Sequence, residues 1–301
     1  MRTFLLLLLG SALFFPPRAQ SITVQRVETV TIPGEGLYHP VFDRQNRIYV
    51  TSEDYRGLYR LEIQSKKRIE LSGKPGAGYK PLFFPDKVVI NPFYRQQGRR
   101  YFQISEIELK DGGRERVLRE GRFISPLSGS RQSLFIKEAD RVRPLRQAFA
   151  KTGAADTLAY ARDSLIVVQT AAGERAWQPL GSGHYIWVSL SPDRSHVLFR
   201  KAGRGSYVMD LEGNILAALP GLNAPQWSPD GTFVVGMRDA DDGYRITASD
   251  IVISDWRRGR EIPVTQTDGS IEMYPAWSPD GSRIAFHTLK GELKIAYVLQ
   301  K

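Results

Sequence analysis

The sequence predicts an all-β protein that folds as a six-bladed β-propeller, and three observations carry this prediction. The segment Pro225–Gly231 has the sequence Pro-Gln-Trp-Ser-Pro-Asp-Gly, and Pro275–Gly281 repeats it as Pro-Ala-Trp-Ser-Pro-Asp-Gly. An apolar, strand-forming segment follows each copy, Phe233–Val235 after the first and Ile284–Phe286 after the second. A unit that recurs after about fifty residues is typical of propellers and solenoids.

The clearest unit begins at the first copy of this pattern and predicts the four antiparallel strands of one blade. Apolar alternation and turn residues place its strands at Pro225–Ser228, Thr232–Met237, Ser249–Asp255 and Glu261–Gln266. Proline presets φ in the turn, aspartate bonds nearby N–H groups and glycine accepts a positive φ. We expect the tryptophan to wedge between blades. The residues interpreted as structural are Trp227, Ser228, Pro229, Asp230, Gly231, Trp277, Ser278, Pro279, Asp280 and Gly281.

Weaker copies extend the repeat over the whole chain. In the register of the clear units, blades start near residues 34, 77, 121, 184, 223 and 273. The stretch 121–183 fits the repeat least well, so five or seven blades remain open. Within it, we expect residues 140–160 to form an insertion. It is either partly helical, with Leu145, Phe149 and Ala150 on one face, or it contains a strand at Thr157–Ala161.

The two ends of the chain are predicted to share one blade. The last unit has strands at Pro275–Ser278, Arg283–His287 and Leu293–Leu299, and the chain ends before a fourth strand. Ile22–Ile32 alternates apolar and polar residues and precedes the first unit. We therefore expect this N-terminal strand to complete the last blade and close the ring, which would leave no unpaired sheet edge at the junction.

Residues 1–19 have the features of a secretory signal. Arg2 supplies a positive charge, Phe4–Phe15 is apolar and small residues near Ala19 suit cleavage there. A membrane anchor is the alternative, but a span needs about 20 apolar residues, and this segment is shorter. We expect residues 20–301 to form a single propeller domain that is periplasmic or secreted, monomeric and not membrane-spanning. The chain has no cysteine, which excludes disulfides and a lipid-anchored cysteine.

The chain is basic, with a formal net charge of +10 from 42 Lys and Arg against 32 Asp and Glu. Clustered basic residues are typical of nucleic-acid binding, but the predicted export argues against a nucleic-acid partner. An acidic protein partner, an anionic lipid headgroup or an anionic glycan fits better. The alternative is a surface that is charged only for solubility. Basic residues gather in the segments 66–68, 95–100, 114–122, 141–151 and 257–260.

The segment Val264–Phe286 resembles the WD40-like (PD40) repeat of the TolB propeller family. It combines a Val-Thr strand end, a short gap, the Trp-Ser-Pro-Asp-Gly turn and an apolar strand. Two copies in the chain match strongly, one fairly and three loosely. The resemblance implies a six-bladed periplasmic propeller that binds envelope proteins, including lipoproteins. The family's namesake also carries an α/β domain before its propeller. Here few residues separate the signal from the first strand, so we expect a stand-alone propeller.

No segment matches a catalytic or cofactor motif, so we predict no catalytic residue, no cofactor and no metal. The chain lacks the Gly-x-Ser-x-Gly nucleophile motif, and Gly73–Gly78 lacks the end of a phosphate loop, which favours a loop between blades. Asp239–Gly243 has the carboxylates of a calcium loop but a misplaced glycine, which favours a polar hairpin. His196 and His287 fall within predicted strands, where we expect ordinary packing roles.

The positions just before the first strand of each blade are predicted to ring one mouth of the channel. Aromatic and basic side chains there favour a docking surface, formed by His39, Lys80, His184, Trp187 and Tyr274. In a ring of six, the two histidines would face each other across the channel. The alternative role of the aromatic residues is packing between blades.

The leading functional prediction is a non-catalytic, protein-binding scaffold of the periplasm or cell envelope. Its expected partner is a protein, with a lipoprotein or another acidic surface as candidates. The alternative is a carbohydrate-active or metal-dependent enzyme that uses the central channel, because propeller lyases of acidic sugars use channel-facing histidines and a metal.

Overall fold

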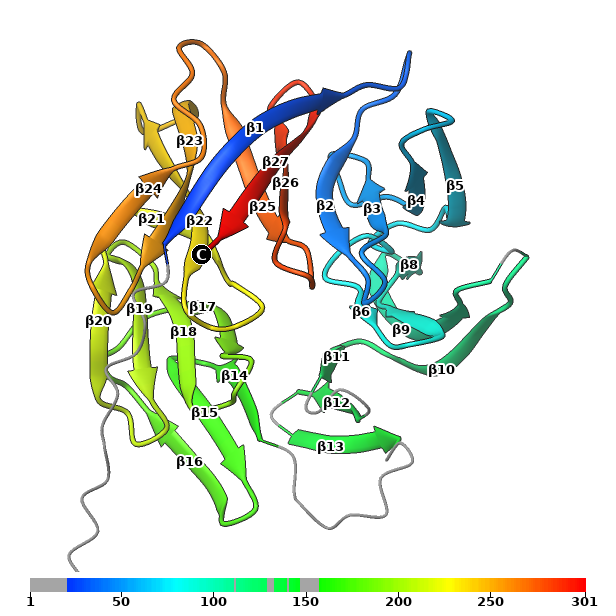
Figure 1. Ribbon diagram of the computed structural model, residues 1–301. Helices are drawn as coiled ribbons and strands as arrows, with labels where there is room; N and C mark the ends of the chain where they lie inside the picture. The colour runs from blue at the N-terminus through cyan, green and yellow to red at the C-terminus, as the bar shows by residue number, and fades with distance from the viewer. Residues whose placement is uncertain (1–20, 111, 129–132, 140, 147–156) are drawn as a thin grey trace, which may run out of the picture.

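The computed structural model describes residues 21–301 except 111, 129–132, 140 and 147–156. In these residues every regular element is a strand, and the strands form seven antiparallel sheets that follow one another around a ring (Figure 1). The chain therefore has the arrangement of a seven-bladed β-propeller. We number the blades in chain order, and blade 7 contains strands from both ends of the chain.

Blades 1 to 4 take up the first half of the ring. Blade 1 comprises β2 (Tyr38–Phe42), β3 (Ile48–Thr51), β4 (Leu58–Glu62) and β5 (Lys67–Ser72). Blade 2 comprises β6 (Leu82–Phe83), β7 (Lys87–Ile90), β8 (Phe93–Gln96), β9 (Arg99–Glu108) and β10 (Glu115–Gly121). Blade 3 comprises β11 (Ile124–Ser128), β12 (Leu134–Glu138) and β13 (Arg141–Arg146). Blade 4 comprises β14 (Leu158–Arg162), β15 (Leu165–Thr170) and β16 (Gly173–Trp177).

Blades 5 to 7 have four strands each. Blade 5 comprises β17 (Tyr185–Leu190), β18 (His196–Lys201), β19 (Gly205–Asp210) and β20 (Ile215–Leu219). Blade 6 comprises β21 (Leu222–Trp227), β22 (Val234–Asp241), β23 (Ile246–Asp255) and β24 (Arg260–Pro263). Blade 7 comprises β25 (Glu272–Trp277), β26 (Arg283–Thr288), β27 (Leu293–Gln300) and the N-terminal strand β1 (Ile22–Val30).

The predicted count of six blades is wrong, and the difference lies in residues 121–183. This stretch, which the repeat assigned to one blade, holds the two sheets β11–β13 and β14–β16. Each has three strands in its described residues, and neither has the Trp-Ser-Pro-Asp-Gly turn that marks other blades. The strand considered at Thr157–Ala161 is present as β14, one residue further on. Leu145 lies in β13, and Phe149 and Ala150 lie outside the described residues.

The N-terminal strand β1 forms one edge of blade 7. It pairs antiparallel with β27, from Ile22 opposite Gln300 to Val30 opposite Leu293. The sheet then continues through β26 to β25, which is its inner strand. Ile22 and Val30 are buried, and each joins an apolar cluster on one side of the blade.

Apolar clusters fill the interfaces between neighbouring blades. In the described residues there are seven, one between each pair of adjacent blades, including the pair of blades 7 and 1. Phe233 and Phe286 are fully buried in the cluster between blades 6 and 7. Full burial of one such side chain contributes about 1.5–3 kcal/mol. The interfaces, rather than the separate blades, therefore hold the hydrophobic core.

The Ser-Pro-Asp-Gly turns join inner strands to the strands that follow them. Ser228 Oγ is fully buried, donates to Asp230 Oδ1 at 2.5 Å and accepts the N–H of Phe233 at 2.9 Å. Gly231 has a φ of +73°, which other residues resist. The same two bonds recur at Ser278 in blade 7, at 2.6 and 2.9 Å. Each turn thus satisfies its own buried polar groups.

The tryptophans before these turns lie at blade interfaces. Trp277 is buried in the cluster between blades 6 and 7 and donates to the backbone oxygen of Gly281 at 3.2 Å. Trp227 packs against the cluster between blades 5 and 6, where its ring meets Trp256 edge-on at 5.8 Å. Adjacent blades are therefore held together beside these turns.

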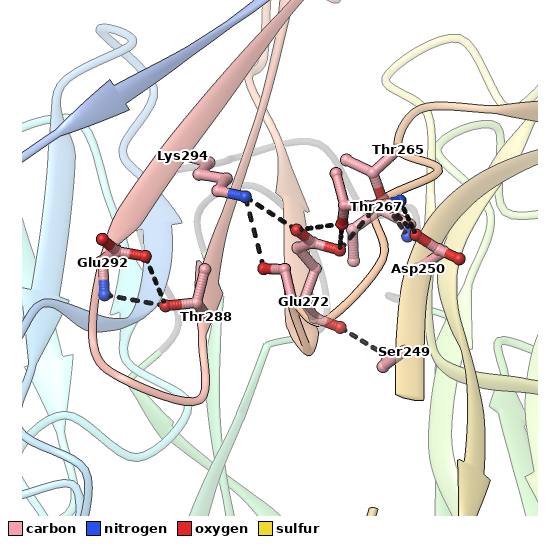
Figure 2. Close-up of polar contacts among 10 residues, drawn as sticks. Ser249, Asp250, Thr265, Thr267, Glu272, Thr288, Glu292 and Lys294 are labelled. Atoms are coloured by element: carbon pink, nitrogen blue, oxygen red, sulfur yellow. Dashed lines mark hydrogen bonds and ion pairs between the residues drawn. The ribbon is translucent and has the colours of Figure 1, made fainter. Parts of the chain in front are cut away.

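A polar network connects blades 6 and 7 (Figure 2). Glu272, the first residue of β25, is fully buried, and its carboxylate accepts bonds from Lys294 Nζ at 2.8 Å and from Thr267 Oγ1 at 2.8 and 2.9 Å. Asp250 of β23 accepts the N–H of Thr267 at 3.1 Å, and Ser249 Oγ donates to the backbone oxygen of Glu272 at 2.6 Å. The network holds the segment between the two blades against both of them.

Two local predictions are confirmed. Gly73–Gly78 lies in the loop between blades 1 and 2, and Asp239–Gly243 belongs to the hairpin of β22 and β23. In the described part of the chain, no helix is long and apolar enough to cross a membrane. Residues 1–19, predicted to be a signal, lie outside the described residues.

Candidate functional site

Five blades have a residue in the left-handed conformation near the start of the inner strand. At this position φ lies between +44° and +51°. Residues other than glycine seldom adopt this conformation, which costs about 1–2 kcal/mol each. The register of the inner strand shifts at the same place in blades 1, 5, 6 and 7. The residues concerned are His39, Lys80, Trp187, Ala224 and Tyr274.

These left-handed residues line a cavity of about 440 Å³ where the inner strands begin. Its wall comes from blades 1, 2, 5, 6 and 7, and no described residue of blades 3 or 4 lines it. The wall is largely aromatic and apolar with a few polar groups, which is typical of a small-molecule site. The side chains that matter most for its chemistry are His39, Tyr55, Tyr79, Lys80, Trp187 and Tyr274.

The structure brings together four of the residues predicted for the channel mouth. His39, Lys80, Trp187 and Tyr274 all line the cavity. His184 does not: it is exposed just before β17, where its backbone oxygen accepts the N–H of Ala202. The prediction that it faces His39 across the channel is therefore wrong. The reason is that Trp187, two residues inside β17, occupies the left-handed position of blade 5.

Histidine and tyrosine rings pack together on one side of the cavity. The ring of His39 stacks on Tyr55, with centroids 4.0 Å apart, and meets Tyr274 and His287 edge-on at 4.8 Å each. Tyr55 in turn meets Tyr79 edge-on at 5.1 Å. Blade 7, blade 1 and the loop between blades 1 and 2 all contribute to this cluster. Packing from several sides fixes the orientation of the His39 ring.

Both imidazoles of the cluster are neutral at pH 7. Burial lowers the pKa of His39 to about 4 and that of His287 to about 4. His39 Nε2 lies 3.2 Å from the backbone oxygen of Glu53, and His287 Nδ1 lies 2.9 Å from that of Thr288. A neutral imidazole donates through one nitrogen only, so His39 Nδ1 and His287 Nε2 are acceptors. Both atoms are buried and have no hydrogen-bond partner among the described residues.

The cavity wall has a net positive charge. Of the described residues that line it, Lys80 has the only formal charge, and its Nζ lies 5.6 Å from the centre of the Tyr79 ring. Burial raises the pKa of both Tyr55 and Tyr274. The negative charge of Asp239 raises the pKa of Tyr274 further. Both hydroxyls therefore stay protonated. The site offers one cation, hydroxyl donors and a neutral imidazole to a bound molecule.

Two residues of this site were not found from the sequence. His287 was expected only to pack, but it pairs with Met273 in the register of β25 and β26, which brings it next to Tyr274. The register of that hairpin was the signal that could have found it. Tyr55 lies in a loop, whose course the strand pattern does not specify.

Comparisons with protein-family models and with curated proteins find no match. Among solved structures, one of similar fold is the crystal structure of oligogalacturonate lyase from Vibrio parahaemolyticus, with a TM-score of 0.46 and 10% identity. A second is oligogalacturonate lyase in complex with manganese, with a TM-score of 0.46 and 14% identity. Each comparison covers 88% of this chain and 78% of the other. At such identities the likeness concerns the fold alone.

These comparisons correct the functional prediction. Both structures are of an enzyme, which contradicts the prediction of a non-catalytic protein-binding scaffold and the prediction that the chain is not an enzyme. The resemblance to the TolB propeller family is supported in its coarser part, the β-propeller fold, and no family match supports its finer part.

The manganese in one of these structures raises the question of whether this chain could hold a metal. The described residues contain no group of three or more His, Asp or Glu side chains that could bind a metal ion. Beside the cavity, the two imidazoles of His39 and His287 stand without a carboxylate in the wall. Manganese prefers carboxylate and other oxygen ligands. The described residues therefore do not fit a manganese site.

Proposed function

We propose that the protein is an enzyme that binds an acidic sugar in the central cavity and eliminates a substituent near its carboxylate. The observation that carries this proposal is the composition of the wall, which has one lysine, several aromatic rings and no carboxylate among its described residues. Such a wall attracts an anion, and flat aromatic rings suit the faces of a sugar ring. Elimination needs proton transfer and charge stabilisation, and the residues present can supply both.

Lys80 would hold the carboxylate of the sugar. Its ammonium group neutralises that carboxylate, so negative charge that develops when the proton on the adjacent carbon is removed is stabilised. Tyr79 and Trp187 line the same cavity and would position the sugar ring. Correct placement of the C–H bond against the base would follow from these contacts.

His39 and Tyr274 would transfer the protons. Neutral His39 accepts the proton through Nδ1, once the ligand displaces the rings that cover this atom. A pKa of about 4 is low for a base, but an anion bound nearby favours the imidazolium and raises it. The electron pair of the broken C–H bond forms a C=C bond, the C–O bond breaks, and Tyr274 donates a proton to the leaving oxygen. No oxidant or other co-reactant is needed.

The test compares digalacturonate with cellobiose, a neutral disaccharide, in the presence of a chelator. We expect calorimetry to detect binding of the acidic sugar and ultraviolet absorbance to detect an unsaturated product. Lys80→Gln should weaken binding, whereas His39→Gln and Tyr274→Phe should abolish turnover with a smaller effect on binding. Equal binding of both sugars, or undiminished turnover in the two latter variants, would refute the proposal.

We further infer that β1 closes the ring and keeps the cavity in shape. His39 and Tyr274 belong to blades 1 and 7, and Val30 of β1 is buried in the apolar cluster between these blades. Val30→Asp should therefore lower both the Tm and the affinity for the sugar. The matched control is Val27→Asp, because Val27 lies in the same strand but is 40% exposed. A Val30→Asp protein as stable as this control would contradict the inference.

We also infer that blades 5 to 7 carry repeats of the TolB propeller type, and that the protein acts outside the cytoplasm. The turns of these blades support the first inference, because serine bonds aspartate two residues on at 2.5, 2.5 and 2.6 Å. The predicted signal supports the second. Cell fractionation and N-terminal sequencing test it: a mature chain that begins near residue 20 is expected, and an intact N-terminus in the cytoplasm would refute it.

A further inference from the structure

A strongly basic hairpin extends from blade 2. It is formed by β8 and the first residues of β9, and its exposed end carries three arginines and no acidic residue. Arg95 lies directly opposite Arg100 in the strand register, and Gln96 lies opposite Arg99. Like charges that face each other across two strands are destabilising. No ion pair is observed for these arginines among the described residues, so their charge is available to a ligand.

The base of this hairpin rests on the loop that leads into the cavity. The N–H of Phe93 donates to the backbone oxygen of Pro75 at 2.9 Å. The Phe93 ring packs so closely on Gly76 that an added Cβ there would lie 2.9 Å from Cδ1 of the ring. The same loop continues to Gly78–Lys80, which lines the cavity. β7 runs antiparallel to β6, and the chain continues from the end of β7 into the hairpin. The hairpin therefore extends beyond the start of β6, at the end of the blade where Lys80 lies.

The opposed arginines are on the face of the hairpin that is turned toward this loop. Side chains alternate between the faces of a strand, so Arg95 and Arg100 share a face with Phe93. The guanidinium carbon of Arg100 lies 4.3 Å from the centre of the Phe93 ring. On the opposite face, Tyr94 and Tyr101 stack on each other at 5.6 Å. The two arginines therefore form a strip of positive charge on one face of the hairpin, at the end of blade 2 where Lys80 lies.

We propose that this strip binds the continuation of an acidic polysaccharide whose end occupies the cavity. The proposal rests on the proposed function, since it extends the same ligand outward. A single chain with a carboxylate on every unit matches a narrow row of cations. Duplex nucleic acid fits less well, because the hairpin of β22 and β23 extends past the start of β21 on the same side of the ring. Its tip carries Asp241 and Asp242, which would repel a broad polyanion lying across this face.

The experiment measures binding of digalacturonate and polygalacturonate by the wild-type chain and by Arg95→Gln/Arg100→Gln. The matched control is Arg175→Gln/Arg204→Gln, which removes the same charge from exposed positions in blades 4 and 5. We expect the hairpin variant to bind polygalacturonate on the order of tenfold more weakly, with unchanged affinity for digalacturonate. The control variant should bind both sugars as the wild type does.

Several outcomes would overturn the proposal. Unchanged affinity of the hairpin variant for polygalacturonate, or an equal loss in the control variant, would leave the arginines with the role of guarding an exposed strand edge. Tighter binding of anionic lipid vesicles or duplex DNA, lost in the same variant, would assign the strip to a different partner. If polygalacturonate binds through the arginines but digalacturonate does not bind at all, the hairpin site stands and the proposed function fails.

Discussion

Removal of the Lys294 ammonium tests how far the polar network between blades 6 and 7 stabilises the ring (Figure 2). Lys294→Met keeps an apolar side chain and leaves the carboxylate of Glu272, which is fully buried, without its cation. Loss of one partner of a buried ion pair costs about 3–5 kcal/mol. The Lys294 side chain is 15% exposed and Thr267 still donates at 2.8 Å, so we expect the lower end, about 3 kcal/mol.

The assay is thermal unfolding followed by calorimetry. In a chain of this size 1 kcal/mol corresponds to about 2 °C, so the Tm of Lys294→Met should fall by about 6 °C. Glu272→Gln should be milder, because Lys294 Nζ can still reach water and Ser270 Oγ, 3.4 Å away. The double variant should recover part of the loss, since it removes both charges together.

A matched control is Lys110→Met. Lys110 Nζ lies 2.9 Å from Glu108, but the two side chains are 71% and 52% exposed. Exposed pairs contribute little to stability, so the Tm of this variant should not change measurably. Equal shifts in Lys294→Met and Lys110→Met would refute the reasoning. A double variant whose loss equals the sum of the two single losses would show that Glu272 and Lys294 are not coupled.

Three further predictions concern the cavity and the turns. A histidine in the unfolded chain has a pKa near 6.5, whereas burial lowers the pKa of His39 and His287 to about 4 in the folded protein. The contribution of these residues to stability is therefore complete above about pH 6.5 and is lost as the pH falls toward 4. The Tm of the double variant His39→Phe/His287→Phe should depend less on pH. An equally steep profile would contradict this. Ser278→Ala removes the acceptor of a backbone N–H at 2.9 Å and should lower the Tm by about 2–6 °C, whereas Ser282→Ala, at an exposed position of the same turn, should not. Gly78→Ala would place a Cβ 2.3 Å from a threonine side chain and 2.7 Å from a backbone oxygen, so calorimetry should show weaker sugar binding; unchanged affinity would show that the loop accommodates it.

The sequence predicts the blades whose turns have the usual residues. It underestimates the number of the remaining blades, and the reason is physical. In blade 1 the carboxylate of Asp43 accepts the N–H groups of Gln45 and Arg47 at 2.9 Å each, as serine and aspartate do together in the final blades. Asn46 takes the left-handed position there, with φ 61°. Because different residues make similar bonds, a pattern of residue types becomes weak while the structure stays regular. Blades 3 and 4 lack the pattern altogether, which is why they were merged into one.

The candidate site could be predicted only as far as it follows from strand order. His39 and Tyr274 were found because they precede a predicted inner strand. The left-handed conformation that directs them into the cavity depends on the strand register. The alternation of apolar and polar residues along a strand does not reveal it. His287 joins the site because it lies opposite Met273, the chain neighbour of Tyr274, and this requires the pairing of β25 with β26 to be known. Contacts between blades therefore determine the part of the site that was missed.

The ring separates the regions that stabilise it from the region that is strained. Five left-handed residues around the cavity cost about 1–2 kcal/mol each. Each of the buried acceptor atoms of His39 and His287 without a partner adds about 1–3 kcal/mol. These costs together are comparable to the whole stability of a typical domain, about 5–15 kcal/mol. They can persist only because the clusters between all blades fix the backbone from outside. Packing alone gives no reason to gather strained backbone and unpaired nitrogens around one cavity. A sugar hydroxyl that donates to His39 would satisfy one of them, so ligand binding accounts for the arrangement better than packing does.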